Sequence, residues 1–306
     1  MPSQDDAQPL APFSVLFDSG EGVETALPPA LAALYGRLAF PAEMGRAWVI
    51  SNFVASIDGV VAYNDPVPPG KGEISASDPH DRAAMGLLRA LADAVIVGAG
   101  TLRAVPRHLW TPAYIYPPLA TEYAALRAAL GKPPAPLNVI VSGSGAVDTA
   151  LPVFQRDDIA TLLLTTRDSA ARLAAQALGP RAQVRAIDAA DDGERGEGDA
   201  ISALATLDAT LTTLAALSPN GGASQPLILV EGGPRLLGGF VAEGLLDEQF
   251  LTIAPQLVGR DDQFHRPGLI EGRRLAPDHP RWARLVSARQ AENFLFLRYR
   301  LTLSSV

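Results

Sequence analysis

The stretch PLILVEGGPRLLGGFVAEGLLDEQFLTIAP, residues 226–255, decides the fold. An apolar run at 226–230 is typical of a buried strand, and two glycines and Pro234 then lead into a helical pattern at 234–243. A second strand pattern follows at 249–253. Buried strands that alternate with helices predict a mainly parallel sheet, because the crossover helices of such a sheet cover both of its faces.

The same alternation runs through most of the chain. Asp78 and Pro79 are typical of a helix N-cap and a first helical residue, and an apolar face follows them. Further strands are predicted at 47–57, 94–97, 137–141, 160–165 and 182–187, and further helices at 31–38, 123–130, 169–178 and 201–217. Residues 64–73, 104–118 and 188–200 are predicted as loops, because they are rich in proline, glycine or acidic residues.

The two ends of the chain differ from this pattern. Residues 293–303 alternate between apolar and polar positions, as strands do, and they predict an antiparallel C-terminal strand pair that completes the sheet. The expected fold class is therefore α/β, in a single domain over residues 46–306. Residues 1–45 are predicted to be an N-terminal extension that packs on this domain.

Composition excludes several classes of function. The 306 residues are 48% apolar and carry a formal net charge of −8, which argues against nucleic-acid binding and a polybasic membrane surface. A signal peptide and a run of about 18 apolar residues are absent, so no membrane partner is expected. The chain has no cysteine, which excludes disulfides, thiolate zinc sites and cysteine nucleophiles and fits a reducing, cytoplasmic location.

The turn after the strand at 226–230 is the clearest candidate binding site, since ligands of parallel sheets bind beyond the carboxyl ends of the strands. Gly232 and Gly233 let backbone N–H groups approach an anion, and Pro234 begins a helix whose N-terminus is partly positive. An ordinary strand-to-helix turn is the alternative. Glu231 needs a partner or a ligand, because it is a carboxylate at the end of a buried strand.

Other strand ends carry weaker patterns. Gly98-Ala99-Gly100-Thr101 fails the dinucleotide fingerprint, because Arg103 stands where the third glycine would be. Thr165-Thr166-Arg167 suits a 2′-phosphate, although such a pattern is more often a helix N-cap beside a surface arginine. Walker A, HExxH and G-x-S-x-G motifs are absent, and Asp261, Asp262 and His265 read as a solvated loop, so no metal is expected.

Taken in order, four segments resemble the pyrimidine reductase family of riboflavin biosynthesis, which has a dihydrofolate-reductase-like fold. They are VISNFVASIDG (49–59), ISASDPHDRAAMGLLRALADAVIVGAGTLRAVP (74–106), LNVIVS (137–142) and LILVEGGPRLLGGFVAEGLLDEQFLTIAPQLVG (227–259). The resemblance implies NADPH as cofactor, a ribosylamino-pyrimidine phosphate as small-molecule substrate, and a homodimer. It implies cofactor contacts from Ala55, Gly98, Gly100, Thr101, Ser142, Gly232 and Gly233, to which the phosphate pattern adds Thr165 and Arg167. It implies substrate contacts from Asn52, Asp58, Arg89 and Glu231. The side chains that take a direct part in the chemical step are left unassigned.

The chain also departs from this family. Asn52 stands where the bifunctional bacterial enzymes tend to carry lysine, so the chain looks more like the stand-alone archaeal and fungal reductases. The bifunctional enzymes also have a deaminase domain whose zinc needs cysteine ligands, and the missing cysteines exclude that activity here. Val105 replaces a usual aspartate at the start of the 105–110 loop, which helps to shape the cleft. Two alternatives therefore remain: a reductase of a pterin or another small imine or carbonyl, and a non-catalytic nucleotide-binding relative.

Overall fold

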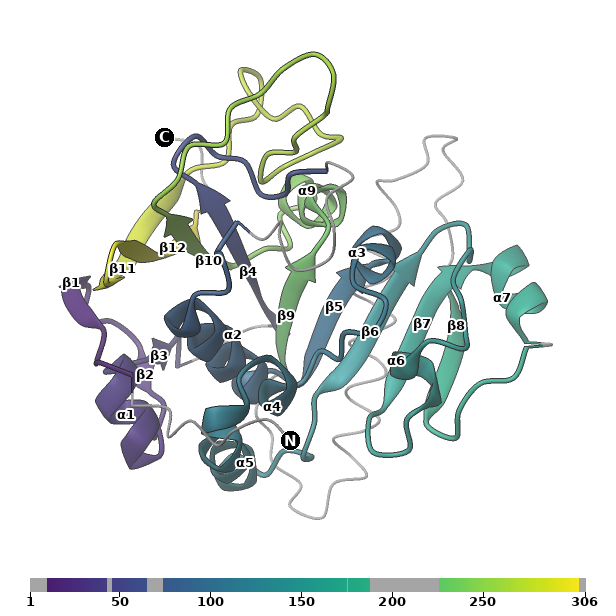
Figure 1. Cartoon of the computed structure of the whole chain (residues 1–306), viewed down its shortest axis with the longest axis horizontal. Helices are drawn as coiled ribbons and strands as arrows, with labels where there is room; N and C mark the ends of the chain where they lie inside the picture. The colour runs from purple at the N-terminus through teal and green to yellow at the C-terminus, as the bar shows by residue number, and fades with distance from the viewer. Residues whose placement is uncertain (1–9, 43–45, 65–73, 175, 188–225, 303–306) are drawn as a thin grey trace, which may run out of the picture.

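A ten-stranded sheet forms the centre of the molecule (Figure 1). The computed structural model describes residues 10–42, 46–64, 74–174, 176–187 and 226–302. The strand order is β1-β11-β12-β10-β4-β9-β5-β6-β7-β8. The predicted loop at 188–200 and the predicted helix at 201–217 lie outside the described residues.

Seven strands are parallel to one another, as the sequence predicts. In sheet order they are β10 (Glu248–Ala254), β4 (Trp48–Ser56), β9 (Leu227–Gly232), β5 (Ala94–Gly98), β6 (Leu137–Ser142), β7 (Thr161–Thr166) and β8 (Ala182–Ile187). The first four residues of β5 are fully buried, because both faces of the sheet are covered. The expected α/β class with a mainly parallel sheet is confirmed.

Three antiparallel strands complete the sheet. They are β12 (Phe294–Leu301), β11 (Ala283–Ala291) and β1 (Ser14–Asp18). The sequence predicts β12 but neither β11 nor β1. The sequence of β11, ARLVSARQA, lacks an apolar alternation, and β1 is exposed over most of its length.

Helices pack on both faces of the sheet. The face that carries Val95 and Val97 of β5 is covered by α2 (Pro79–Leu91), α5 (Ala120–Ala129) and the N-terminal α1 (Pro29–Tyr35). The opposite face, with Ile96, packs against α9 (Pro234–Ala242). The shorter helices are α3 (Ala99–Ala104), α4 (Pro112–Ile115), η1 (Pro117–Leu119), α6 (Pro152–Gln155) and α7 (Arg167–Leu173), and β2 (Val23–Glu24) pairs with β3 (Ala39–Phe40) in a separate small sheet.

Two details differ from the prediction. Residues 104–118, predicted to be irregular, contain α4, which begins because the Thr111 side chain accepts a hydrogen bond from the Tyr114 N–H. The predicted helix at 169–178 is the shorter α7, which begins at Arg167 and ends at Leu173. Of the described helices, none is long and apolar enough to cross a membrane.

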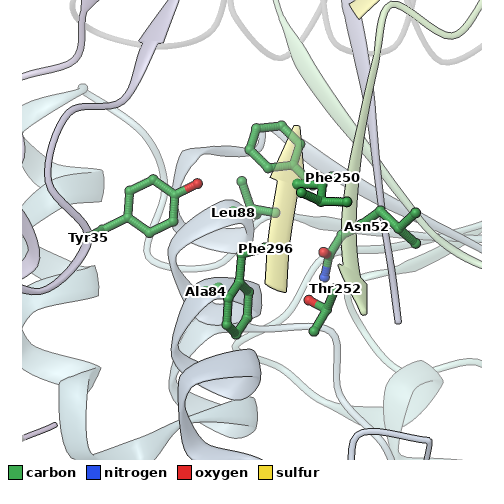
Figure 2. Close-up of a pocket in the computed structure, with 9 residues that line it drawn as sticks. Tyr35, Asn52, Ala84, Leu88, Phe250, Thr252 and Phe296 are labelled. Atoms are coloured by element: carbon green, nitrogen blue, oxygen red, sulfur yellow. The ribbon is translucent and has the colours of Figure 1, made fainter. Parts of the chain in front are cut away.

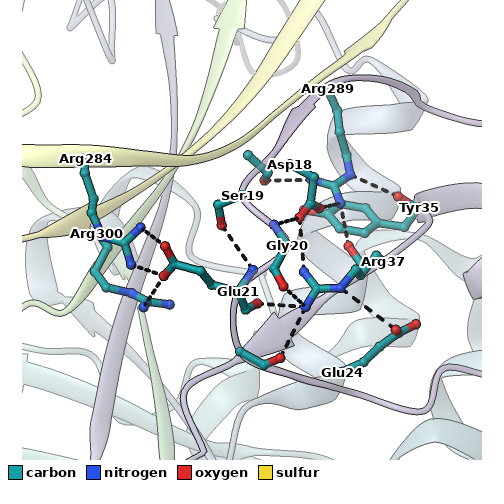
Figure 3. Close-up of polar contacts among 12 residues, drawn as sticks. Asp18, Ser19, Gly20, Glu21, Glu24, Tyr35, Arg37, Arg284, Arg289 and Arg300 are labelled. Carbon is teal, nitrogen blue, oxygen red and sulfur yellow. Dashed lines mark hydrogen bonds and ion pairs between the residues drawn. The ribbon is translucent and has the colours of Figure 1, made fainter.

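A network of arginines and acids joins the N-terminal segment to β11 and β12 (Figure 3). Arg37 pairs with Asp18 at 3.0 Å and donates to three carbonyls of the turn after β1. Arg289 of β11 is buried against the ring of Tyr35 and donates to the Tyr35 carbonyl at 3.0 Å. Glu21 lies between Arg284 and Arg300. Residues 10–42 are therefore held to the sheet by buried as well as surface contacts.

Candidate functional site

The turns after β5 and β9 meet at the carboxyl edge of the sheet. A Cβ added at Gly232 would lie 2.6 Å from Oγ1 and 2.9 Å from Cγ2 of Thr101, so only glycine fits there. Gly233 has φ +84°, a conformation that L side chains rarely adopt. At the two positions before α9, the main chain thus carries no side chains. This arrangement suits a group that must approach the main chain closely.

Arg89 and Glu231 form a buried ion pair beside this turn. Arg89 lies in the last turn of α2 and Glu231 near the end of β9, and their side chains are 2% and 3% exposed. Nε and Nη2 of Arg89 lie 2.8 and 2.7 Å from Oε2 of Glu231. Glu231 Oε1 has no hydrogen-bond partner among the described residues. Burial raises the pKa of Glu231, and the Arg89 charge acts in the opposite direction.

The loop that departs from the family pattern packs on Arg89. Nη2 of Arg89 lies 3.0 Å from Nε2 of His108, and Nη1 donates to the carbonyls of Leu109 and Thr111 at 3.4 and 3.3 Å. Since arginine only donates, Nε2 of His108 accepts. Burial and the Arg89 charge lower the pKa of His108 to about 3, which keeps the imidazole neutral.

A second buried acid lies on α2, the helix that carries Arg89. Asp81, in the first turn of α2, is 3% exposed and forms hydrogen bonds with the side chains of Thr252 and Ser75. Sequence reasoning missed this residue, because an acid in the first turn of a helix is common on electrostatic grounds alone. Its only sequence signal is its place beside an apolar helical face.

Asn52 borders a small cavity between α2 and the sheet (Figure 2). The cavity holds about 20 Å³, room for one water molecule, and is lined by Tyr35, Asn52, Ala84, Leu88, Phe250, Leu251, Thr252, Phe296 and Leu297. The amide of Asn52 and the hydroxyl of Thr252 face each other in it. Asn52 thus lies on the α2 face of the sheet, where the Asp81 partner Thr252 also lies.

The carboxylate of Asp58, a predicted substrate residue, accepts hydrogen bonds from other parts of the protein. Its carboxylate accepts from the Ser56 hydroxyl at 2.6 Å and from the N–H groups of Val258 and Gly259 at 3.1 and 2.8 Å. These bonds hold the pKa of Asp58 well below its usual range. They tie the turn after β4 to the loop after β10. A direct role towards substrate stays a prediction.

The predicted cofactor residues lie along the carboxyl edge of the sheet. They differ in how far they are buried or hydrogen-bonded within the protein. Ala55 is buried in β4, and Gly98 and Gly100 lie at the start of α3, where a Cβ on Gly100 would meet no atom within 4 Å. The Thr165 hydroxyl donates to the Ser142 carbonyl at 2.6 Å, so it is engaged with the neighbouring strand. Arg167 begins α7 on the surface, next to the edge formed by β6 and β7.

The turn after β6 is fastened to α7. Ser169 and Arg172 donate to the Ser144 carbonyl at 2.9 and 2.8 Å. In the part of the chain that the structure describes, no three histidine or acidic side chains are grouped as a metal site would need. The edge is therefore built from backbone, hydroxyls and arginines, which are groups that bind phosphate.

A family model, the RibD C-terminal domain, matches residues 47–285. Solved structures share the fold at low identity. A pyrimidine reductase-like protein from Corynebacterium diphtheriae is 19% identical over 89% of this chain and 98% of that protein, with a TM-score of 0.59. The riboflavin biosynthesis reductase Rib7 of Saccharomyces cerevisiae is 12% identical over 86% and 93%, with a TM-score of 0.51.

RibD of Acinetobacter baumannii is 18% identical over 89% of this chain, with a TM-score of 0.56. The match covers 60% of that protein, so this chain corresponds to only part of it. Among curated protein sequences, none matches this chain significantly. The family match begins after residues 10–42, so β1, β2, α1 and β3 lie outside it.

Proposed function

The chain belongs to the RibD C-terminal domain family, and we propose on this premise that it is an NADPH-dependent reductase of a ribosylamino-pyrimidine 5′-phosphate, whose sugar becomes a ribityl chain. The observation that carries the proposal is the buried Arg89–Glu231 pair beside the bare Gly232–Gly233 turn. A hydroxyl or N–H group of a substrate would satisfy the free Oε1 of Glu231, which is otherwise costly to bury.

The residues present fit NADPH. The Gly232–Gly233 turn and Thr101 would hold the pyrophosphate, because a side chain at Gly232 would fill the space that the close approach needs. Arg167 would hold the 2′-phosphate. NADPH supplies the hydride when bound. The protein would orient the substrate against it, with Glu231 and Asn52 fixing the polar edge of the substrate.

The test of this proposal is calorimetric titration with NADPH and NADH, followed by the decrease in NADPH absorbance when the substrate is added. We expect NADPH to bind at least tenfold more tightly than NADH (~1.4 kcal/mol,). Glu231→Gln should keep cofactor affinity and lose turnover at least ~100-fold, because an amide does not balance the Arg89 charge. The matched control is Glu292→Gln, at an exposed position in the turn between β11 and β12. Binding of neither nucleotide would overturn the proposal.

One observation favours a second candidate, a reductase of a pterin or another small imine. All five N–H groups of Arg89 have acceptors inside the protein: Glu231, His108 and the carbonyls of Leu109 and Thr111. Arg89 therefore has no donor to spare for a substrate phosphate unless the loop moves. Turnover of a dihydropterin, without turnover of the ribosylamino-pyrimidine, would favour this candidate. Binding of NADPH without its oxidation in the presence of either substrate would favour a non-catalytic relative.

A further inference from the structure

Asp81 is a buried acid for which the proposed reaction has so far no use. Its side chain joins two elements of the site, because it is on α2 and bonds to Thr252 on β10. Its own backbone N–H is taken by the Asp78 carboxylate at 2.9 Å, which caps the helix. The carboxyl group is therefore held in one place by Thr252 and Ser75 rather than by its helix.

The groups around Asp81 favour its protonated form. Burial, with the negative charges of Asp78 and Glu231, raises its pKa to about 6, and the hydrogen bonds of Thr252 and Ser75 act in the opposite direction. Glu231 is buried as well, but it has Arg89 as a counter-charge. Asp81 thus differs from Glu231 in that no positive charge is among the causes that shift its pKa, and a protonated carboxyl group can act as a general acid.

Asp81 lies on the face of α2 that borders the small cavity. Asp81, Ala84 and Leu88 are spaced three and four residues apart and so share one face of α2. Ala84, Leu88 and Thr252 line the cavity that also contains the amide of Asn52 (Figure 2). Asp81 is therefore joined through Thr252 to the wall of that cavity.

The other titratable groups described at the site, Glu231, His108 and Arg89, form hydrogen bonds with one another. Glu231 is the counter-charge of Arg89. His108 is neutral, and its Nε2 accepts a hydrogen bond from Arg89. Reduction of a C=N bond nevertheless needs one proton for each hydride.

We propose that Asp81 is the proton donor of the reduction and a catalytic residue of this chain. This inference rests on the proposed function. The hydride, with its electron pair, leaves the reduced nicotinamide and forms a C–H bond at the carbon of a C=N group. The π electrons move to the nitrogen, which takes the Asp81 proton. Asp81 is left as a carboxylate, stabilised by Thr252 and Ser75, and solvent returns the proton. The substrate class is a C=N compound, either an opened ribosylamine imine or a ring imine.

The first arm of the test needs no substrate. We expect an infrared C=O band of a protonated carboxyl group that titrates with a midpoint near pH 6 and is missing in Asp81→Asn. Thr252→Val should move the midpoint upward, because the hydrogen bond that it removes lowers the pKa. Asp278→Asn is the control for an exposed acid and should leave the band unchanged. Absence of the band in the wild-type protein at about pH 5 would overturn the proposal.

The second arm measures single-turnover oxidation of bound NADPH against pH, with the ribosylamino-pyrimidine phosphate and a dihydropterin as separate substrates. For whichever substrate reacts, the wild-type rate should fall about tenfold per pH unit above the midpoint, and Asp81→Asn should be at least ~100-fold slower and independent of pH. An Asp81→Asn enzyme with the wild-type rate and profile would overturn the proposal. A wild-type protein that binds no NADPH would overturn the proposed function instead, and the infrared band still decides whether Asp81 holds a proton.

Discussion

Gly232 is fixed by its neighbour Thr101 rather than by its own backbone. A methyl group on Gly232 would lie 2.6 Å from Thr101 Oγ1, so Gly232→Ala should push the turns after β5 and β9 apart. We expect NADPH affinity to fall at least tenfold (~1.4 kcal/mol,) in calorimetry. Gly268→Ala is the control, since a Cβ there meets no atom closer than 3.8 Å. Unchanged affinity in Gly232→Ala would remove the cofactor assignment of this turn.

The raised pKa of Asp81 also predicts how the free energy of unfolding depends on pH. Its pKa rises from 3.8 in the unfolded chain to about 6 in the folded protein, so the folded state holds the proton more tightly. The wild-type protein should therefore lose up to roughly 3 kcal/mol of stability from this group as pH rises from about 4 to about 8. Asp81→Asn should lack this loss. Urea denaturation of both proteins at the two pH values measures it, and a difference between them that does not change with pH would contradict the assignment.

At the scale of elements, α2 is held at its C-terminal end by a buried guanidinium. Arg127 of α5 is 1% exposed and donates through Nη1 to the carbonyls of Arg89, Ala90 and Ala92 at 3.2, 3.1 and 2.8 Å. These are carbonyls that the end of a helix leaves unsatisfied. Arg127→Met keeps most of the apolar stem and removes the donors. We expect a loss of about 2–3 kcal/mol in chemical denaturation, against little change for the exposed Arg181→Met. An equally small effect of both would show that these bonds are not needed.

The parallel strands could be predicted because each is a continuous apolar run between polar turns, and the sheet buries both of its faces. β11 could not, because polar positions such as Arg289 are buried there by pairing with carbonyls of the N-terminal segment. Arg289 reads as a surface residue until the fold brings Tyr35 to it. The local pattern shows propensity and amphipathicity, but not which distant segment satisfies a buried charge.

In the candidate site, too, several residues could be predicted from the sequence, but the contacts between them could not. Glu231 and Arg89 were each placed towards the substrate by resemblance, but their pairing joins residues that are 142 positions apart in the chain. His108 belongs to the predicted loop at 104–118, and its surroundings in the sequence are typical of a surface loop. It lies instead, half-buried, against Arg89 and the rings of Trp110 and Tyr114. Asp81 was missed because its burial depends on Thr252, on a strand far along the chain.

At the scale of the whole molecule, the N-terminal segment shares one core with the rest. Phe13, Leu31 and Leu38 belong to the same apolar cluster as Leu88 of α2 and Phe296 of β12. Leu31→Ala should therefore lower global stability by about 2–4 kcal/mol while unfolding stays a single transition. Calorimetry and tryptophan fluorescence should report the same midpoint. Val23→Ala, at an exposed position, is the control. A separate early transition in Leu31→Ala would show that residues 10–42 fold independently.

The open edge of the sheet bears on assembly. Among the described strands β1 stands at one end of the sheet order, and Val15, Leu16 and Phe17 are 53%, 56% and 44% exposed. An apolar edge strand pairs readily with another chain, and two copies related by a twofold axis would pair β1 with β1 antiparallel. We therefore predict a homodimer joined at β1. Light scattering at micromolar concentration should give twice the monomer mass, and Leu16→Lys should give the monomer mass, because a charge on the edge opposes pairing. Val23→Lys, exposed on β2 in the separate small sheet, should remain dimeric. A monomeric wild-type protein would remove the dimer, and a dimeric Leu16→Lys would place the interface elsewhere.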